Sequence, residues 1–213
     1  LVWTAKPNRR LAKAFANAQS FESEEDRHRF VFDGVPIVNG TFSQSSLLLN
    51  RALRSVVHEA LQGAASVLDL YCGGGGIALS LAGAARKVVG VELNAAAVAD
   101  AKANAERNGI KNCEFYNAAV ELMLPSLLDM RPDAVVVDPP RAGLHAKAAA
   151  TLLEMAPPVI FYVSCNPESL ARDLKILGAR YTVETLVCVD LFPHTDHVET
   201  VARLVRLPLA SAV

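Results

Sequence analysis

Short apolar runs alternate with helical patterns from about residue 63 to residue 206. The runs predict strands near 66–71, 87–92, 112–117, 133–138, 158–164, 181–191 and 197–206. The segments between them have apolar residues at helical spacing and predict helices near 76–84, 94–108, 119–129, 145–155 and 167–177. This alternation predicts an α/β fold with a mostly parallel sheet. The last two strands have no helix between them, so they predict an antiparallel C-terminal hairpin.

The first 62 residues predict a small appendage to a main domain that spans residues 63–213. Three short apolar runs within residues 29–42 are separated by Asp-Gly and Asn-Gly dipeptides, which are both hairpin-turn signals. They predict a small antiparallel meander, in which Pro36 confines the middle run to an edge or an irregular strand. A helical pattern from residue 45 to residue 62 completes the appendage.

A glycine-rich turn follows the first strand of the main domain, at Gly73–Gly76. Glycines between a strand and a helix allow a tight bend and a close approach of the backbone to a ligand. The next strand ends in Glu92, 23 positions after Asp69. In doubly wound sheets, an acid at this place hydrogen-bonds a ribose hydroxyl. Strand, glycines, helix, strand and terminal acid in this order therefore predict a site for a nucleoside-containing cofactor.

Three segments with reactive side chains lie at one edge of the predicted sheet. Asp138 closes the fourth strand, Cys165 closes the fifth, and Glu199 lies near the start of the last strand. Ligands of such sheets bind outside the carboxyl ends of the strands. Because the last strand is antiparallel, its start lies at the same edge, and we expect Asp138, Cys165 and Glu199 to converge.

Each of these residues has a functional and a structural interpretation. A helix is expected to begin at Asn166-Pro167, and its positive end would favour the thiolate of Cys165, making it a nucleophile; a small buried hydrophobe is the alternative. An apolar pocket would raise the pKa of Glu199 toward the working range of a general base; a surface glutamate is the alternative. The segment Asp138-Pro-Pro holds a loop beside a planar substrate or is simply a stiff turn.

Composition and charge limit the classes of partner. The chain has 213 residues, 52% of them hydrophobic, and a net charge of −1. It can therefore build a large core, and it has no global attraction to nucleic acid, so any contact with RNA must come from local patches or another domain. No apolar run reaches the roughly 18 residues that a membrane span needs, so we expect no contact with a membrane.

The cysteines and histidines do not form a metal-binding pattern. Four cysteines lie far apart without a Cys-x-x-Cys pair: Cys72, Cys113, Cys165 and Cys188. This spacing argues against zinc or an iron–sulfur cluster and favours a reducing, cytoplasmic location. All of them except Cys165 are expected to be small buried hydrophobes. His194 and His197 lack a strong zinc-ligand spacing, so we expect no metal in this chain.

Six motifs occur in an order typical of one enzyme family: Phe42–Gln44, Asp69–Gly73, Val89–Glu92, Asp138–Gly143, Ser164–Pro167 and Phe192–Glu199. Over about residues 30–206 the chain resembles the C-terminal catalytic domain of the RNA uracil-5-methyltransferases. The resemblance implies a class I methyltransferase fold, S-adenosyl-L-methionine as cofactor, and ribosomal or transfer RNA as substrate. Members usually carry an N-terminal RNA-binding barrel; none is visible here, so we expect weak RNA binding by this chain alone. We also expect a monomer.

The resemblance also implies roles for single residues. Cofactor contacts are implied at Gln44, Tyr71, Gly73, Gly76, Glu92 and Asp138. Substrate contacts are implied at Asp138, Arg141 and Asn166. Cys165 falls on the nucleophile that adds to carbon 6 of uracil, and Glu199 falls on the base that removes the carbon 5 proton.

Two other functions stay open at this point. An amino-group nucleic-acid methyltransferase would use Asp138-Pro139-Pro140 to accept an exocyclic nitrogen, but it needs no covalent nucleophile. A cofactor-binding or RNA-binding module would need no catalysis at all. The intact pair of Cys165 and Glu199 argues against both alternatives.

Overall fold

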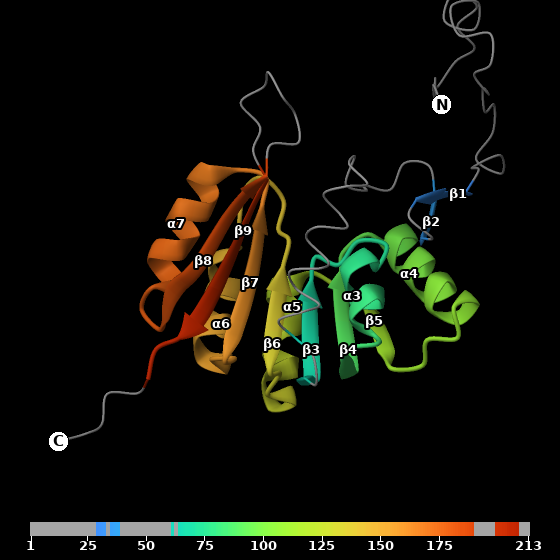
Figure 1. The fold of residues 1–213 in the computed structure, drawn as a ribbon, viewed down its shortest axis with the longest axis horizontal. Helices are drawn as coiled ribbons and strands as arrows, with labels where there is room; N and C mark the ends of the chain where they lie inside the picture. Colours follow the sequence, from blue (N-terminus) through green and yellow to red (C-terminus); the bar gives the residue numbers. More distant parts are fainter. Residues whose placement is uncertain (1–28, 33–34, 39–60, 62–63, 190–198, 209–213) are drawn as a thin grey trace, which may run out of the picture.

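The structure is a computed structural model that describes residues 29–32, 35–38, 61, 64–189 and 199–208. Its helices and strands follow the order expected from the hydrophobic pattern (Figure 1). In chain order they are β1 (Arg29–Phe32), β2 (Val35–Val38), β3 (Ala64–Leu70), α3 (Gly76–Leu81), β4 (Ala85–Glu92), α4 (Ala95–Arg107), β5 (Cys113–Asn117), α5 (Val120–Met123), η1 (Leu124–Met130), β6 (Ala134–Val137), α6 (Ala146–Met155), β7 (Val159–Ser164), α7 (Pro167–Leu177), β8 (Tyr181–Val189) and β9 (Glu199–Arg206).

The main sheet has seven strands in the order β5-β4-β3-β6-β7-β9-β8. β9 runs antiparallel to both of its neighbours, β7 and β8, and the other neighbouring strands are parallel. The mostly parallel α/β sheet with an antiparallel C-terminal hairpin is therefore confirmed. In Figure 1, β9 begins at the upper edge of the sheet, where the parallel strands end.

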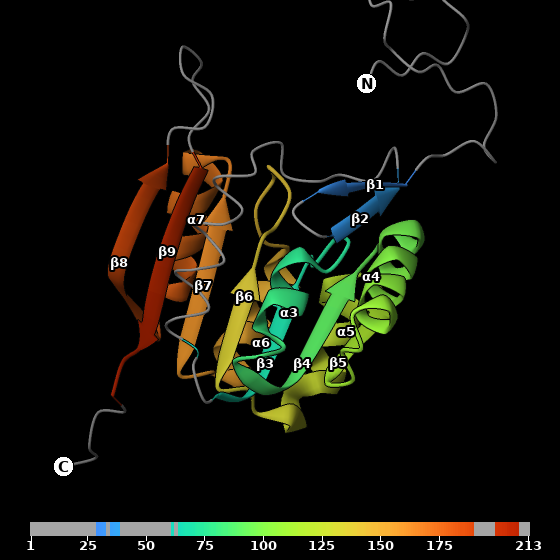
Figure 2. The same ribbon diagram turned by 45° about the vertical axis from the view of Figure 1, so that its right-hand side comes forward.

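Apolar side chains fill both faces of the sheet, because consecutive residues of a strand point in opposite directions. Val67 and Val88 belong to the cluster under α3 and α4, whereas Leu68 and Val89 belong to the cluster under α5, α6 and α7. The two helical layers are visible in Figure 2. Burial of one such side chain contributes about 1.5–3 kcal/mol. The central strands are thus a stable frame for the loops at their ends.

The helix expected at 119–129 differs from the prediction. The segment forms a short α-helix, α5, followed by the 3₁₀-helix η1. Pro125 lies in the first turn of η1 and has no N–H to donate to a carbonyl four residues back, which ends the α-helical pattern. Among the described residues, no helix is long and apolar enough to span a membrane.

The first described elements, β1 and β2, form a separate antiparallel hairpin, with Val31 opposite Pro36. β2 pairs only with β1 in the described part of the chain, as expected for a strand that contains proline. The hairpin lies against α4 (Figure 2). The third run of the expected meander and the helix at 45–62 fall outside the described residues, apart from Leu61. The domain boundary at 62/63 stays a prediction.

Gly90 in β4 is closely packed against side chains of the sheet, and its substitution tests this packing. A Cβ at Gly90 would lie 2.6 Å from Cδ1 of Phe115 and 2.8 Å from Sγ of Cys72. We expect Gly90→Ala to lower the free energy of unfolding by about 1–3 kcal/mol, because both neighbours are buried and must move. Urea unfolding followed by circular dichroism measures this loss.

Gly83→Ala is the matched control for Gly90→Ala. Gly83 is exposed, and among the described residues a Cβ there would meet nothing within 4 Å. We expect a change within about 0.5 kcal/mol. Equal losses for the two variants would contradict the steric explanation.

Candidate functional site

The candidate site lies at the edge of the sheet where β7 ends and β9 begins. Ser164, the last residue of β7, pairs with Thr200 of β9, so Cys165 and Glu199 follow as neighbours on two adjacent strands. The charges of Glu199 and Asp138 both act on the Cys165 thiol. The expected convergence of the thiol and the two carboxyl groups is therefore confirmed.

Cys165 stands directly before the cap of α7. Asn166 caps the helix with its side-chain oxygen, which accepts a hydrogen bond from the amide two residues further on (3.1 Å), so the expected helix start is confirmed. Burial, and then the charges of Glu199 and Asp138, raise the pKa of the Cys165 thiol, while Arg141 acts in the opposite direction. Burial and the two negative charges thus favour the neutral thiol, and a contribution of the helix end in the opposite direction stays a prediction.

Glu199 opens β9 and is half-buried. Its backbone pairs with Val189 of β8, which fixes its position at the start of β9. Burial raises the pKa of its carboxyl group above the ordinary value of 4.5, as expected. A carboxylate with a raised pKa is a stronger proton acceptor near neutral pH. Glu199 therefore has the chemical properties of a general base.

The loop after β6 carries Asp138 and Arg141 to the same edge. The amide of Asp138 donates to the carbonyl oxygen of Leu70 (3.2 Å), and the carbonyl oxygen of Arg141 accepts from Nδ2 of Asn166 (2.9 Å). The loop is thus attached to β3 at one end and to the cap of α7 at the other. Asn166 uses both ends of its amide within the protein, so a substrate contact by Asn166 stays a prediction.

The glycine turn after β3 leaves its backbone accessible. Apart from the chain neighbours, no atom of the described residues lies within 4 Å of the position of a Cβ at Gly73, Gly74 or Gly76, so this part of the protein leaves the backbone open to a ligand there. Tyr71 precedes the turn with a φ of 62°, and its amide donates to the carbonyl oxygen of Val91 (2.8 Å). The expected tight turn between β3 and α3 is confirmed.

Glu92 at the end of β4 holds the glycine turn in place. Its Oε2 accepts from the amide of Gly73 (3.1 Å), and its Oε1 accepts from the amide of Asn94 (2.7 Å), the residue that caps α4. Each carboxylate oxygen has a second lone pair. Glu92 can therefore fix the turn and still accept a hydrogen bond from a hydroxyl group of a ligand.

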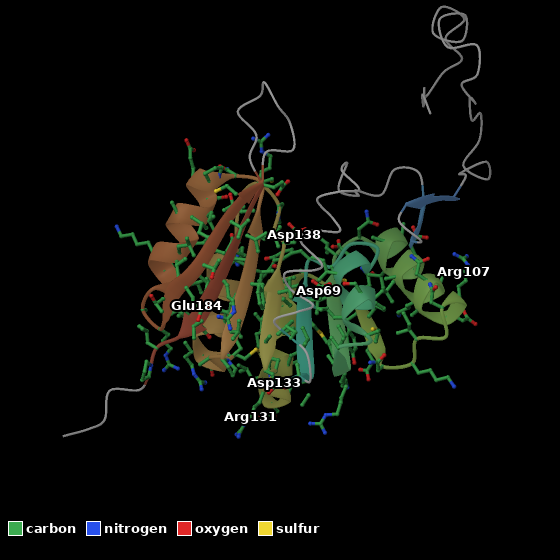
Figure 3. All side chains as sticks on the ribbon, in the orientation of Figure 1. Asp69, Arg107, Arg131, Asp133, Asp138 and Glu184 are labelled. Carbon is green, nitrogen blue, oxygen red and sulfur yellow. The ribbon has the colours of Figure 1, made fainter. Side chains whose placement is uncertain are left out.

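Asp69 lies fully buried beneath the glycine turn. Its Oδ2 accepts from the amide of Ala78 (2.9 Å), and no partner is found for its Oδ1 in the described residues. Burial, followed by the charge of Asp138, raises the pKa of Asp69 to about 8, which favours the protonated form at neutral pH. Figure 3 shows Asp69 and Asp138 in the same region of the sheet, and Asp133 at its opposite edge.

The remaining candidate residues are only partly described. Cys72 is buried, as expected, whereas Cys113 is only partly buried and packs against the same cluster. Cys188 is exposed, so its expected burial is wrong. It lies on β8, the edge strand, whose side chains from Thr182 to Cys188 are exposed. Gln44, His194 and His197 lie outside the described residues. Within the described ranges, no three His, Cys, Asp or Glu side chains are grouped as metal ligands.

Sequence reasoning did not identify Asp173 on α7. This carboxylate is fully buried and accepts four hydrogen bonds, from the amide of Leu144, the hydroxyl of Tyr162, and Nε and Nη2 of Arg172. A usable signal exists, because Asp173 lies on the buried side of α7 with Leu170 and Leu177. An acid on an apolar helix face needs buried donors.

Two comparisons of sequence relate the chain to known proteins. The model of the tRNA (uracil-5-)-methyltransferase family matches residues 27–207. An uncharacterized RNA methyltransferase of Bacillus cereus is 44% identical over 165 residues, which are 76% of this chain and 35% of the relative. Another from Gloeobacter violaceus is 40% identical over 195 residues, which are 91% of this chain and 41% of the relative.

Solved structures support the same relationship. A tRNA (uracil-54, C5)-methyltransferase of Pyrococcus abyssi, in complex with S-adenosyl-L-homocysteine, has a TM-score of 0.70 and 37% identity, over 84% of this chain and 44% of that chain. The N-methyltransferase NodS of Bradyrhizobium japonicum has a TM-score of 0.63 at 14% identity, over 75% of this chain and 87% of that chain, which shows the fold alone. The chain spans less than half the length of the relatives from Bacillus cereus, Gloeobacter violaceus and Pyrococcus abyssi. It belongs to the tRNA (uracil-5-)-methyltransferase family.

Proposed function

We propose that the whole protein methylates carbon 5 of a uridine in RNA, with S-adenosyl-L-methionine as methyl donor. The observation that carries this proposal is the pairing of β7 with β9, which makes Cys165 and Glu199 neighbours at the carboxyl edge of the sheet. An enzyme that methylates an amino group needs neither a nucleophilic thiol nor a second carboxylate beside it. The relatives named RNA methyltransferases and the Pyrococcus abyssi structure support the same choice.

The residues at the glycine turn fit a nucleoside cofactor of this kind. The backbone at Gly73, Gly74 and Gly76 is accessible, and Glu92 has acceptor capacity for ribose hydroxyls. Asp138, at the next strand end, adds a carboxylate on the side of the turn that faces Cys165. When bound, S-adenosyl-L-methionine supplies an electrophilic methyl group on a positively charged sulfur. We propose that these residues hold it.

The proposed reaction begins with the thiolate of Cys165. Carbon 5 of uracil is a weak nucleophile, but a bond from the sulfur to carbon 6 places negative charge on carbon 5 and the adjoining carbonyl oxygen. Carbon 5 then takes up the methyl group. Glu199 removes the remaining carbon 5 proton, the carbon–sulfur bond breaks, and the electron pair returns to Cys165. Cys165 thus ends the cycle as the thiolate with which it began, and the proton is left on Glu199.

The uracil ring must leave its stack to reach the thiol. Extrusion of a base costs a few kcal/mol, and less where the base already lies in a loop. In the proposed complex, the loop from Asp138 to Arg141 stands beside the ring and limits its orientation. Arg141 is exposed beside Cys165 and is proposed to contact the substrate.

Fluorinated RNA tests the covalent step directly. RNA that contains 5-fluorouridine has no removable proton at carbon 5 after methylation, so elimination stalls and the adduct persists. We expect full-length protein with S-adenosyl-L-methionine to form a complex with such RNA that survives denaturing electrophoresis. Cys165→Ala should abolish both this complex and methyl transfer to ordinary RNA. Cys188→Ala, which removes an exposed thiol on a neighbouring strand, should change neither; methylation by Cys165→Ala would rule out the scheme.

Glu199→Gln tests the proton acceptor. The substitution keeps the size of the side chain and removes its basicity, so addition and methyl transfer proceed while elimination is slowed. We expect the covalent adduct to accumulate on ordinary RNA and turnover to fall by about 10²- to 10⁴-fold. The control is Glu168→Gln, an exposed acid at the start of α7 that should leave turnover unchanged. Wild-type turnover by Glu199→Gln would remove Glu199 from this role.

The electrostatic environment of Cys165 predicts a dependence on pH. Since burial and the charges of Glu199 and Asp138 raise its thiol pKa, the neutral thiol dominates at pH 7 and reactivity increases as the pH rises. We expect the midpoint of Cys165 alkylation by iodoacetamide, followed by peptide mass spectrometry, to lie above that of an ordinary thiol. Asp138→Asn removes one negative charge and should shift this midpoint to lower pH. A midpoint below the ordinary value in the wild type would contradict the structure.

A further inference from the structure

The loop from Asp138 to Leu144 is tied to α7 by the buried carboxylate of Asp173 and by Arg172. Oδ2 of Asp173 accepts from the amide of Leu144 (2.7 Å), and its Oδ1 accepts from Nε and Nη2 of Arg172 (2.9 and 2.8 Å). The same Nη2 donates to the carbonyl oxygen of Ala142 (2.7 Å). Two backbone groups of one loop, one donor and one acceptor, are thus bound by one pair of neighbouring side chains.

The sequence of the loop is matched to this pair. Gly143 lies between the two bound backbone groups with a φ of 79°, and a Cβ there would collide with Nη2 of Arg172 and Oδ2 of Asp173. The side chains therefore pack directly onto the backbone of the loop. A loop that needed no fixed position would not require glycine at this point.

The surroundings of Asp173 make the attachment strong. The carboxylate is fully buried, so its hydrogen bonds are not exchanged with water, and charged donors and acceptors form the stronger hydrogen bonds. The hydroxyl of Tyr162 in β7 donates to it as well (2.6 Å), and both this bond and burial raise the pKa of that hydroxyl. Through Asp173 the loop is thereby attached to β7, the strand that ends directly before Cys165, as well as to α7.

This attachment of the loop affects how far Asp138 and Arg141 lie from Cys165 in the proposed site. Asp138 and Arg141 lie on the loop, whereas Cys165 lies between β7 and α7, and no covalent segment shorter than about 25 residues joins them. The Asn166 bond to Arg141 is a single neutral contact near the partly exposed surface. The pair on α7 adds two charged contacts, a buried one from Asp173 to Leu144 and an exposed one from Arg172 to Ala142.

We propose that Arg172 and Asp173 act as positioning residues that hold Asp138 and Arg141 in place against Cys165. They act through the backbone of the loop, at Ala142 and Leu144. This inference rests on the proposed function, because it assigns the loop a place beside the uracil ring. Its closest alternative is a contribution to the stability of the fold alone.

Arg172→Gln separates these possibilities. More than half of the Arg172 side chain is exposed (54%), so its replacement opens no cavity. The variant loses the bridge between Asp173 and Ala142, while the bonds of Asp173 to Leu144 and Tyr162 remain; urea unfolding followed by circular dichroism checks that it is folded. In full-length protein with 5-fluorouridine RNA and S-adenosyl-L-methionine, we expect the single-turnover rate of adduct formation at saturating RNA to fall roughly 10- to 100-fold. We expect the dissociation constant for RNA to change no more than in the control.

The control is Lys175→Gln, which removes a positive charge from an exposed residue of the same helix. It should have the wild-type rate, so a loss confined to Arg172→Gln cannot come from weaker attraction to phosphate. Hydrogen exchange of the peptide from Asp138 to Leu144 provides a second readout, which should be faster in Arg172→Gln alone. A wild-type adduct rate in Arg172→Gln, or equal losses in both variants, would overturn the inference.

The outcomes also distinguish this inference from the proposed function. If wild-type protein formed no adduct with fluorinated RNA, the proposed function would fail, whatever the variant did. The attachment of the loop would then be judged from hydrogen exchange, where unchanged protection of the loop in Arg172→Gln would overturn it.

Discussion

The antiparallel pairing of β9 with β7 is the constraint on which the site depends. In a wholly parallel sheet, the start of the last strand would lie at the edge opposite the ends of the other strands. Because β9 runs the other way, Glu199 at its start lies beside Cys165, which follows the end of β7. The pairing of Ser164 with Thr200 sets the spacing of these two residues. A slip of the register by one residue would turn every side chain of β9 to the other face. Such a slip would remove Val201 and Leu204 from the two apolar clusters that they occupy on opposite faces of the sheet.

Two buried carboxyl groups, Asp69 and Asp173, serve this edge in different ways. Asp69 has one bonded oxygen, a neighbouring negative charge and a pKa raised to about 8, so protonation relieves the cost of its burial. Asp173 accepts four hydrogen bonds, two of them from Arg172, which compensate a buried negative charge. Residues of the same type, equally buried, thus differ in the donors that surround them.

Much of the fold follows from the sequence, and the limits have physical causes. The strand ends and the convergence of Asp138, Cys165 and Glu199 follow from hydrophobic period and chain direction alone. The break at Pro125 was missed because an apolar helical pattern outweighed a visible proline. The attachment of the loop by Arg172 was not predictable, because it joins residues 30 positions apart through a backbone carbonyl that carries no sequence signal. The exposure of Cys188 depends on which strand forms the edge, which local pattern does not determine.

The raised pKa of the Cys165 thiol depends on residues that are distant in the sequence, so the local sequence does not predict it. The N-terminal end of α7 favours a negative charge, but this effect falls off within one turn. Burial and two carboxyl groups from distant segments raise the pKa of the thiol. The same arrangement has a chemical consequence. Because the charge of Asp138 raises the thiol pKa, a positive charge that offsets Asp138 must lower it. S-adenosyl-L-methionine carries such a charge, so in the proposed function the thiol becomes more reactive when the methyl donor is in place and stays largely protonated when it is not.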